Sequence, residues 1–332
     1  MCLKCGSSFS INYDRTETFF WIPHIDGLPF RKLGDERGLG GAQAYNRAVA
    51  EIQKLPDNTE LTKGLCDPIR FSRRLVIDGK YIAVKDFGDK IPFIYGIDYL
   101  THDIPFGGLF LAEDSMAFVM FFDNLKLLGY NPEAVIADDR SGLKPALLKA
   151  FPLARLQLCQ NHYLEKIRQD LKVRTDNRYA HFYNSLSKRV FQEAKDQAGI
   201  TEAWRHVWKE RTHGNRMLQD ILKDIDRRRH DLFACLNIRD CPNTTNIIES
   251  YNSHLQGRLD TIKGFQSFES AQAWLNAYLI RRRTKILTDC KGKFKLLNKH
   301  CSLEFTIKKQ APWPDALTKL GIKPIKFSEK SG

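Results

Sequence analysis

Apolar residues recur in two different periods along the middle of the chain. The runs RLVIDGKYIAVK, IPFIYGIDYL and IPFGGLFLAE are β-rich and separated by short polar turns, which predicts an antiparallel meander of three strands. In EDSMAFVMFFDNLKLLGY the apolar positions recur at helical spacing, and Gly129 follows as a stop. The segments AVIADD, SGLKPALLKAF and ARLQLC then predict a strand, a helix and a strand.

The resulting order is three antiparallel strands followed by two strands that are reached through right-handed helical crossovers. This order predicts an α/β protein with a mixed five-stranded sheet, as in an RNase H-like domain. We expect residues 70–165 to form the first part of this core, and residues 243–290 to form its C-terminal helical part. Residues 166–242 are strongly helical and charged, and they are too long for a connection within a compact domain, which predicts an all-α insertion.

A helical pair is predicted near the N-terminus, in residues 17–60. The apolar positions fit two short helices joined by the glycine-rich turn GLGG, which suits a helix-turn-helix. Gln43, Asn46 and Arg47 would then face a DNA groove. The alternative is a plain αα-hairpin, and the basic context favours the DNA-binding interpretation. At the other end, residues 291–332 are basic and contain APWP, so we expect a loosely attached tail.

Charge points to a polyanionic partner. The 332 residues include 52 Lys and Arg against 39 acids, a net charge of +13, and neutralising phosphates releases counterions. An inert basic surface would have the same balance. Clusters of arginine nevertheless indicate local patches for nucleic acid, and the residues expected to contact DNA there are Arg227, Arg228, Arg281 and Arg282.

Cysteine usage indicates a reducing compartment. Eight scattered cysteines are too few for a disulfide framework, no run approaches a membrane span, and the N-terminus lacks the features of a signal peptide. We therefore expect a cytoplasmic protein without a membrane partner, associated with the nucleoid if the host is a prokaryote. Cys2 and Cys5, within residues 1–16, resemble one knuckle of a zinc ribbon, but tetrahedral zinc takes four ligands. A complete Zn²⁺ site is not expected.

Three acids occupy the positions that two-metal phosphoryl transfer requires on this type of sheet. Asp78 lies on the first strand, Asp138 at the end of the fourth, and Glu249 on a later helix. Mg²⁺ prefers oxygen ligands and keeps several waters, so three carboxylates suffice. Taken singly, Asp78 could belong to an Asp-Gly turn, Asp138 or Asp139 could cap a helix, and Glu249 could be a solvated surface acid. Their joint placement favours the metal site.

Three blocks of the sequence resemble the Mutator-like transposases and their bacterial insertion-sequence relatives. IADDRSGLKPALLKAFPLARLQLCQNH is similar to the second-aspartate block of that family, TTNIIESYNSHLQGR to its glutamate block, and LVIDGKYIAVK to its first-aspartate block. The resemblance implies a triad of Asp78, Asp138 and Glu249. It selects Asp138 over Asp139, which is then a neighbour of the metal site, because Asp138 lies four residues before Gly142-Leu143.

The same blocks contain Cys159-x-x-His162. As a zinc site this pair lacks two ligands, and packing of Cys159 with a hydrogen-bonding His162 at a helix start accounts for most of the pattern. The resemblance implies that the pair lies beside the metal ligands and helps to position the metal centre or the DNA.

The resemblance also implies a function, a DDE transposase that uses Mg²⁺ or Mn²⁺ to cut double-stranded DNA at transposon ends and to join the 3′-OH to target DNA. It further implies a homo-oligomer on DNA. Two alternatives remain open at this point: a nuclease of the same fold without strand transfer, and a DNA-binding regulator derived from a defective transposase.

Overall fold

Five strands form one mixed sheet within the residues that the computed structural model describes, 19–262 and 264–327. The strand order is β3-β2-β1-β4-β5. The first three strands pair antiparallel, whereas β4 pairs parallel with both β1 and β5. The predicted mixed sheet is confirmed, and it is consistent with an RNase H-like α/β fold. The strands are β1 Arg74–Val84, β2 Asp89–Asp98, β3 Phe106–Leu109, β4 Ala134–Ala137 and β5 Arg155–Leu158.

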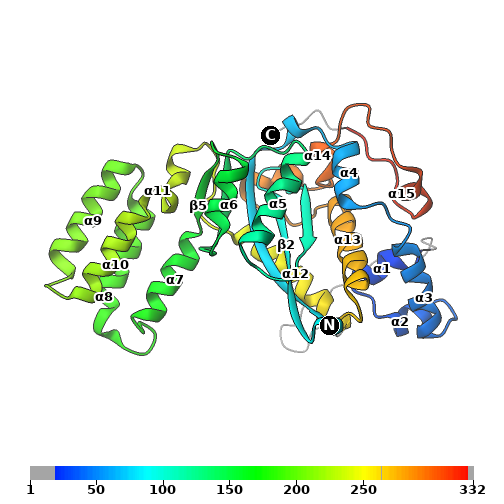
Figure 1. Cartoon of the computed structure of the whole chain (residues 1–332), viewed down its shortest axis with the longest axis horizontal. Helices are drawn as coiled ribbons and strands as arrows, with labels where there is room; N and C mark the ends of the chain where they lie inside the picture. Colours follow the sequence, from blue (N-terminus) through cyan, green and yellow to red (C-terminus); the bar gives the residue numbers. More distant parts are fainter. Residues whose placement is uncertain (1–18, 263, 328–332) are drawn as a thin grey trace.

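Helices cover both faces of this sheet (Figure 1). Helices α5 (Ser115–Leu127) and α6 (Leu143–Ala150) pack together on one face, and α12 (Asn246–Ile262) and α13 (Phe268–Thr284) lie against the other. Three consecutive residues of β1, Leu75 to Ile77, are buried, as expected for a strand that is covered on both sides.

A glycine permits the close approach of α5 to the loop that follows β4. Gly142 precedes α6 with φ +80°, and a Cβ atom at this position would lie 2.7 Å from the Ser115 backbone. A residue with a side chain would be strained there and would displace α5. The loop that carries Asp138 is thus held against the helix layer of the sheet.

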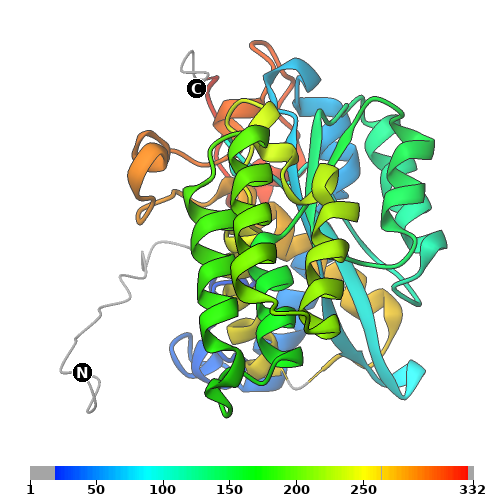
Figure 2. The ribbon, with the colours of Figure 1, turned by 90° about the vertical axis from the view of Figure 1, so that its left-hand side faces the viewer.

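The all-α segment leaves the sheet at β5 and forms a separate bundle at one end of the molecule (Figures 1 and 2). It begins with α7 (Gln160–Asp170), earlier than the predicted boundary at residue 166, and its other elements are a 3₁₀ turn Asn177–Tyr179, α8 Ala180–Ser185, a π-helix Leu186–Glu193, α9 Gln197–Arg211, α10 Arg216–Arg227, α11 Arg229–Leu232 and a 3₁₀ turn Ala234–Asn237. The chain then returns to the sheet through α12, so the bundle interrupts the core.

The N-terminal helices lie at the opposite end of the sheet (Figure 1). Helices α2 and α3 pack against each other around a small core of their own, which includes Leu33 and Ala44. Two packed helices are therefore confirmed, whereas a DNA-binding helix-turn-helix stays a prediction. Cys2 and Cys5 lie outside the described residues. The helices are α1 Trp21–Ile25, α2 Phe30–Asp35, α3 Gly41–Ile52 and α4 Asn58–Leu65, with 3₁₀ turns at Pro68–Arg70 and Lys85–Phe87.

The C-terminal segment is packed, and the expectation of a loosely attached tail is wrong for residues 291–327. The Trp21 indole donates to the Leu320 carbonyl (2.9 Å), and Cys66 and Ile307 form an isolated β-bridge. Apolar residues of the segment are buried in the main core. The sequence pattern did not reveal this packing, because the partners come from distant parts of the chain. Its elements are a 3₁₀ helix Gly292–Leu297, α14 Leu303–Thr306 and α15 Asp315–Lys319.

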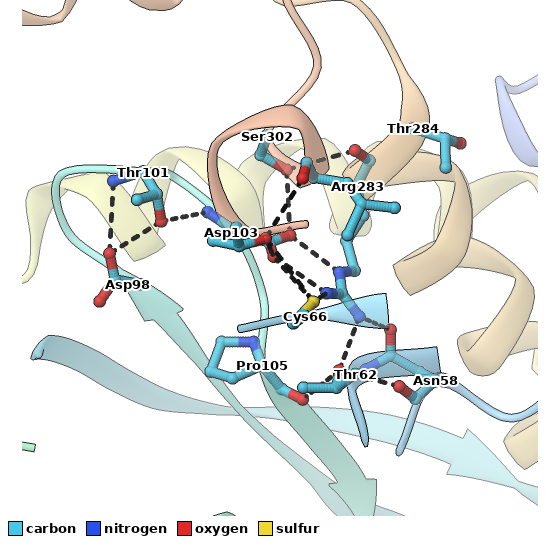
Figure 3. Close-up of polar contacts among 12 residues, drawn as sticks. Asn58, Thr62, Cys66, Asp98, Thr101, Asp103, Pro105, Arg283, Thr284 and Ser302 are labelled. Carbon is cyan, nitrogen blue, oxygen red and sulfur yellow. Dashed lines mark hydrogen bonds and ion pairs between the residues drawn. The ribbon is translucent and has the colours of Figure 1, made fainter. Parts of the chain in front are cut away.

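A buried ion pair ties four parts of the chain together (Figure 3). Arg283 on α13 donates from Nε and Nη2 to the two carboxylate oxygens of Asp103, at 2.8 and 2.9 Å. The same guanidinium donates to Asn58 and Thr62 of α4 (2.8 and 2.7 Å), and the Thr306 hydroxyl of α14 donates to Asp103 (2.5 Å). Both charges are fully buried and hydrogen-bonded, which is the condition under which a buried pair is tolerated.

No helix in the described ranges is long and apolar enough to cross a membrane. The cysteines that the structure describes, from Cys66 to Cys301, are all free thiols.

Candidate active site

Asp78 and Asp138 lie side by side on neighbouring strands. Strand β1 pairs in parallel with β4, with Val76 opposite Ile136. The same register, continued by two residues, brings Asp78 next to Asp138, and adjacent strands are about 4.8 Å apart. The two carboxylates are close enough for the charge of Asp138 to raise the pKa of Asp78.

Glu249 comes from the first turn of α12 and faces the same place. The Thr245 hydroxyl, just before the helix, donates to Glu249 Oε1 (2.9 Å). His162 Nδ1 lies 3.9 Å from that oxygen and 2.7 Å from Asp138 Oδ1. Through His162, the structure thus brings the second aspartate and the glutamate together across 111 positions of the chain.

The Cys159-x-x-His162 pair lies behind these carboxylates. Cys159 lies between β5 and α7 and is buried. Its Sγ is 3.4 Å from the backbone nitrogen and 3.2 Å from Oγ1 of Thr245. His162 is on the first turn of α7, with 47% of its side chain exposed. Ligand atoms of Asp138, Cys159 and His162 all lie within 4.8 Å of one another. The thiol is engaged by Thr245, so its position is explained by packing without a metal.

Asp139 points elsewhere. Its carboxylate pairs with Arg228 Nη1 at 2.6 Å, and Arg228 Nε lies 3.1 Å from Asp224 of the insertion. About half of the Asp139 side chain is exposed, against 19% for Asp138. The adjacent aspartates therefore have different environments, and Asp139 links the insertion to the core.

Sequence reasoning missed Asn252 and Tyr95, which together hold the Asp78 carboxylate. Asn252 donates from Nδ2 to Asp78 Oδ2 (2.7 Å), and the Tyr95 hydroxyl holds Asn252 by donating to its Oδ1 (2.9 Å). The backbone N–H of Gly79 donates to the other oxygen of Asp78 (2.8 Å). Asn252 could have been found from its spacing, since residues three apart lie on one helix face and Asn252 follows Glu249 by three.

A fourth acid, Glu113, was also missed. It follows β3 in sequence, and its side chain is only 7% exposed. The Tyr81 hydroxyl donates to Glu113 Oε2 (2.9 Å), and Arg140 Nε lies 3.4 Å from Oε1. Arg140 in turn lowers the pKa of both Asp78 and Asp138. No local sequence signal marks this contact, because it joins loops on different strands.

The electrostatics of the site favour a cation. Burial, with the nearby charges of Asp138 and Glu113, raises the pKa of Asp78 to about 6 against the opposing effects of Gly79 and Arg140. Burial also raises the pKa of Asp138. Asp138 Oδ1 is buried and lies 2.7 Å from His162 Nδ1. Crowded, desolvated carboxylates are stabilised by a divalent cation.

Two open cavities meet at His162. One of about 220 Å³ is lined by Asp138, Arg140 and Lys166, among others. The other, of about 380 Å³, runs from Glu249 to Tyr183 and to Ser187 of the π-helix. The carboxylates are therefore accessible from the side on which the insertion stands.

The residues predicted to contact DNA lie outside these cavities. Gln43, Asn46 and Arg47 are exposed on α3, as the helix-turn-helix interpretation requires. Arg227 pairs with Asp224 on its own helix. Arg281 is held by Asp26 (2.6 Å), and the guanidinium of Arg282 lies 4.3 Å from the centre of the Tyr251 ring. These last two arginines are thus largely engaged within the chain.

Comparison with known proteins identifies the family. The sequence model of the Mutator family of transposases matches residues 109–284. The match includes Asp138, Cys159, His162 and Glu249, and it begins after Asp78. No curated protein matches the chain at a significant level. The matched segment is more than half of the sequence and spans β4, β5, the insertion and α12, and the chain belongs to the Mutator family of transposases.

Proposed function

We propose that the protein is a DDE transposase that cuts DNA at the ends of a mobile element and joins the exposed 3′-OH to target DNA. The observation that carries the proposal is the convergence of Asp78 and Asp138 from adjacent strands with Glu249 from α12. Membership of the Mutator family supports the reaction class and implies that the protein acts on DNA.

The carboxylates fit a divalent metal. Asp78, Asp138 and Glu249 supply oxygen donors, which Mg²⁺ and Mn²⁺ prefer, and burial raises the pKa of both aspartates, a cost that a bound cation would offset. When bound, such ions would activate the attacking hydroxyl and neutralise the leaving oxygen. Zinc at Cys159 and His162 has less support, because the Cys159 sulfur is engaged by Thr245.

The remaining residues orient these ligands. Asn252 and the Gly79 N–H fix the two oxygens of Asp78, and Thr245 fixes one oxygen of Glu249. His162 stands between Asp138 and Glu249 with an exposed ring edge, where it can contact DNA or steady both acids. Partners of this kind typically change metal affinity or activity by about 10- to 100-fold.

The test is cleavage and joining of duplex DNA that carries the element's own terminal sequences, with Mg²⁺ or Mn²⁺. We expect the wild type to cut and join. Asp138→Asn and Glu249→Gln should each lower the rate at least roughly a hundredfold, since losing a metal ligand costs at least as much as losing a residue that orients one. Asp139→Asn tests the adjacent acid, and Asp123→Asn, on the exposed face of α5, is the inert control.

The outcomes separate the proposed functions. Full activity in Asp138→Asn and Glu249→Gln would exclude this triad. Cleavage without joining would indicate a nuclease of the same fold. DNA binding with neither reaction, in the wild type with either metal, would indicate a regulator derived from a defective transposase.

A further inference from the structure

A small basic pocket of about 20 Å³ lies between α12, α13 and the end of α1, and a ligand can reach it only from its surface. Its charged and titratable residues are Asp26, His254, Arg258, Tyr278, Arg281, Arg282 and Lys285. Four of these carry permanent positive charge, and Asp26 is the acid among them. Asp26 is shared by Arg281 (2.6 Å) and Lys285 (3.0 Å). Positive charge is therefore in excess, and it is concentrated where two helices meet.

Arg282 has an unused donor in this pocket. Its guanidinium stacks on the Tyr251 ring, while Nε is buried without a hydrogen-bond partner among residues 19–262 and 264–327. Buried polar groups are almost always paired, and an unpaired donor of a charged group is costly. Arg282 is thus a buried cation whose hydrogen-bonding capacity is incompletely used.

Arg258 has no acid partner in the described ranges, and the fold makes room for it. Gly27, in the turn after α1, has φ +108°, and a Cβ atom there would lie 2.5 Å from Arg258 Nη1. The backbone conformation favours glycine at this point, and the Arg258 guanidinium occupies the space that a side chain at position 27 would take.

The pocket has a positive potential. Burial lowers the pKa of His254, and the charge of Arg282 lowers it further. Asp289 opposes this effect, and Arg258 and Lys285 add smaller effects that lower the pKa. Such a field attracts anions, and guanidinium groups bind phosphate oxygens through two parallel hydrogen bonds.

The pocket lies away from the carboxylates. With 3.6 residues per turn, His254 and Arg258 are about 140° and 180° around α12 from Glu249, and Arg258 is about 14 Å further along the helix axis. A phosphate held here cannot be the one at the cleavage site. It belongs to a more distant part of the DNA or to another molecule.

We propose that this basic pocket binds a phosphate group of the DNA backbone outside the cleavage site, on the far flank of the helix that carries Glu249. The inference rests on the proposed function, because it takes the protein to be a DNA-binding transposase. A free phosphate ion has the same chemistry, and the experiment below distinguishes the two sources.

The test measures DNA binding without divalent metal, so that it does not depend on catalysis. Fluorescence anisotropy of a duplex is followed at several salt concentrations for the wild type, Arg258→Gln and Lys285→Gln. We expect each variant to bind several-fold more weakly and to lose about 0.9 from the slope of log K against log salt, the value for one phosphate contact. Arg258→Lys keeps the charge and should keep the slope. Lys126→Gln, at an exposed position of α5, is the control.

A second arm uses inorganic phosphate at constant ionic strength. Stabilisation of the wild type by phosphate, absent in Arg258→Gln, together with unchanged DNA affinity of that variant, would overturn the DNA assignment in favour of a free ion. Unchanged slopes and no effect of phosphate would overturn the site. Loss of DNA affinity in the pocket variants while Asp138→Asn still binds DNA would support the pocket, whatever the cleavage assay shows.

Discussion

Three consecutive arginines on α13 have three different environments. Arg281 is paired with Asp26, Arg282 stacks on Tyr251, and Arg283 is buried with Asp103. As sequence, the triplet indicates a single basic patch. Successive helical residues point about 100° apart, so only one side of the triplet meets the core. The partners of Arg281 and Arg283 lie more than a hundred positions away, and the partner of Arg282 lies on the preceding helix.

Replacing Arg283 should cost stability, because it would leave the Asp103 carboxylate buried and unpaired. We expect Arg283→Met to lower the free energy of unfolding by about 3–5 kcal/mol, measured by urea denaturation. Arg178→Met removes an exposed ion pair with Asp176 and should cost less than about 1 kcal/mol. Equal effects would mean that the Asp103 network (Figure 3) contributes no more than a surface pair.

The raised pKa of Asp78 predicts a pH dependence of metal binding. A metal requires the ionised carboxylate, and with a pKa of about 6 Asp78 is protonated below that value. The affinity for Mn²⁺ should therefore fall as the pH drops through 6, by roughly tenfold per unit at the lower end, since one proton must be released. Titration followed by electron paramagnetic resonance measures it. A constant affinity between pH 5 and 7 would contradict the prediction.

At the level of elements, the packing of the C-terminal segment was the feature that the sequence predicted least well. Its charge and its prolines indicated a tail, but its apolar residues are buried in the core, and its backbone bonds to Trp21 of α1 and to Cys66 just after α4. By contrast, the strands and crossover helices were predictable, because their periodicity is local. Asp78, Asp138 and Glu249 could be proposed for the same reason, while Glu113 and Arg140 meet through loops that no pattern connects.

Two leucines of this segment test its packing. Leu303 is 1% exposed and Leu296 is 73% exposed. We expect Leu303→Ala to cost about 2–5 kcal/mol in unfolding free energy, the usual range for a buried leucine, and Leu296→Ala to stay within about 0.5 kcal/mol. Similar small losses for both would show that the segment is only loosely attached in solution.

The insertion meets the core through Arg228, which joins Asp139 to Asp224. Arg227 has Asp224 as its one acidic partner among the residues that the structure describes, and it is the matched control. Arg228→Gln should lower the cleavage rate roughly ten- to a hundredfold, because a shift of the insertion by even about 1 Å relative to the carboxylates can cost that much. Arg227→Gln should have a small effect in the same assay. Equal rates for the two variants would mean that this link does not position the insertion.

On the scale of the whole molecule, helical modules stand at opposite ends of the sheet, with the proposed active site on the side of the insertion (Figure 1). The family match covers the core from the end of β3 to α13, while α1 to α4, β1 and β2 precede it. Yet β1 is the central strand of the sheet and carries Asp78.

The net charge of +13 predicts strongly salt-dependent DNA binding. Each phosphate neutralised should contribute about 0.9 to the slope of log K against log salt, so contacts spread over both ends would give a steep slope. The check is to measure this slope for the full chain binding to a duplex of random sequence. A flat dependence would contradict a binding surface built on lysine and arginine.

The hydrogen bond from Asn252 to Asp78 spans 174 positions. A ribosome working at about 5–20 residues per second needs roughly 9 to 35 s to make the chain between them. Once Asp138 has been added, the nascent protein holds both aspartates but still lacks the glutamate and the helix that orients them. Long-range closure of this kind also slows folding. The proposed active site therefore cannot assemble until most of the polypeptide has been synthesised, and chains released before that point lack one of its three carboxylates.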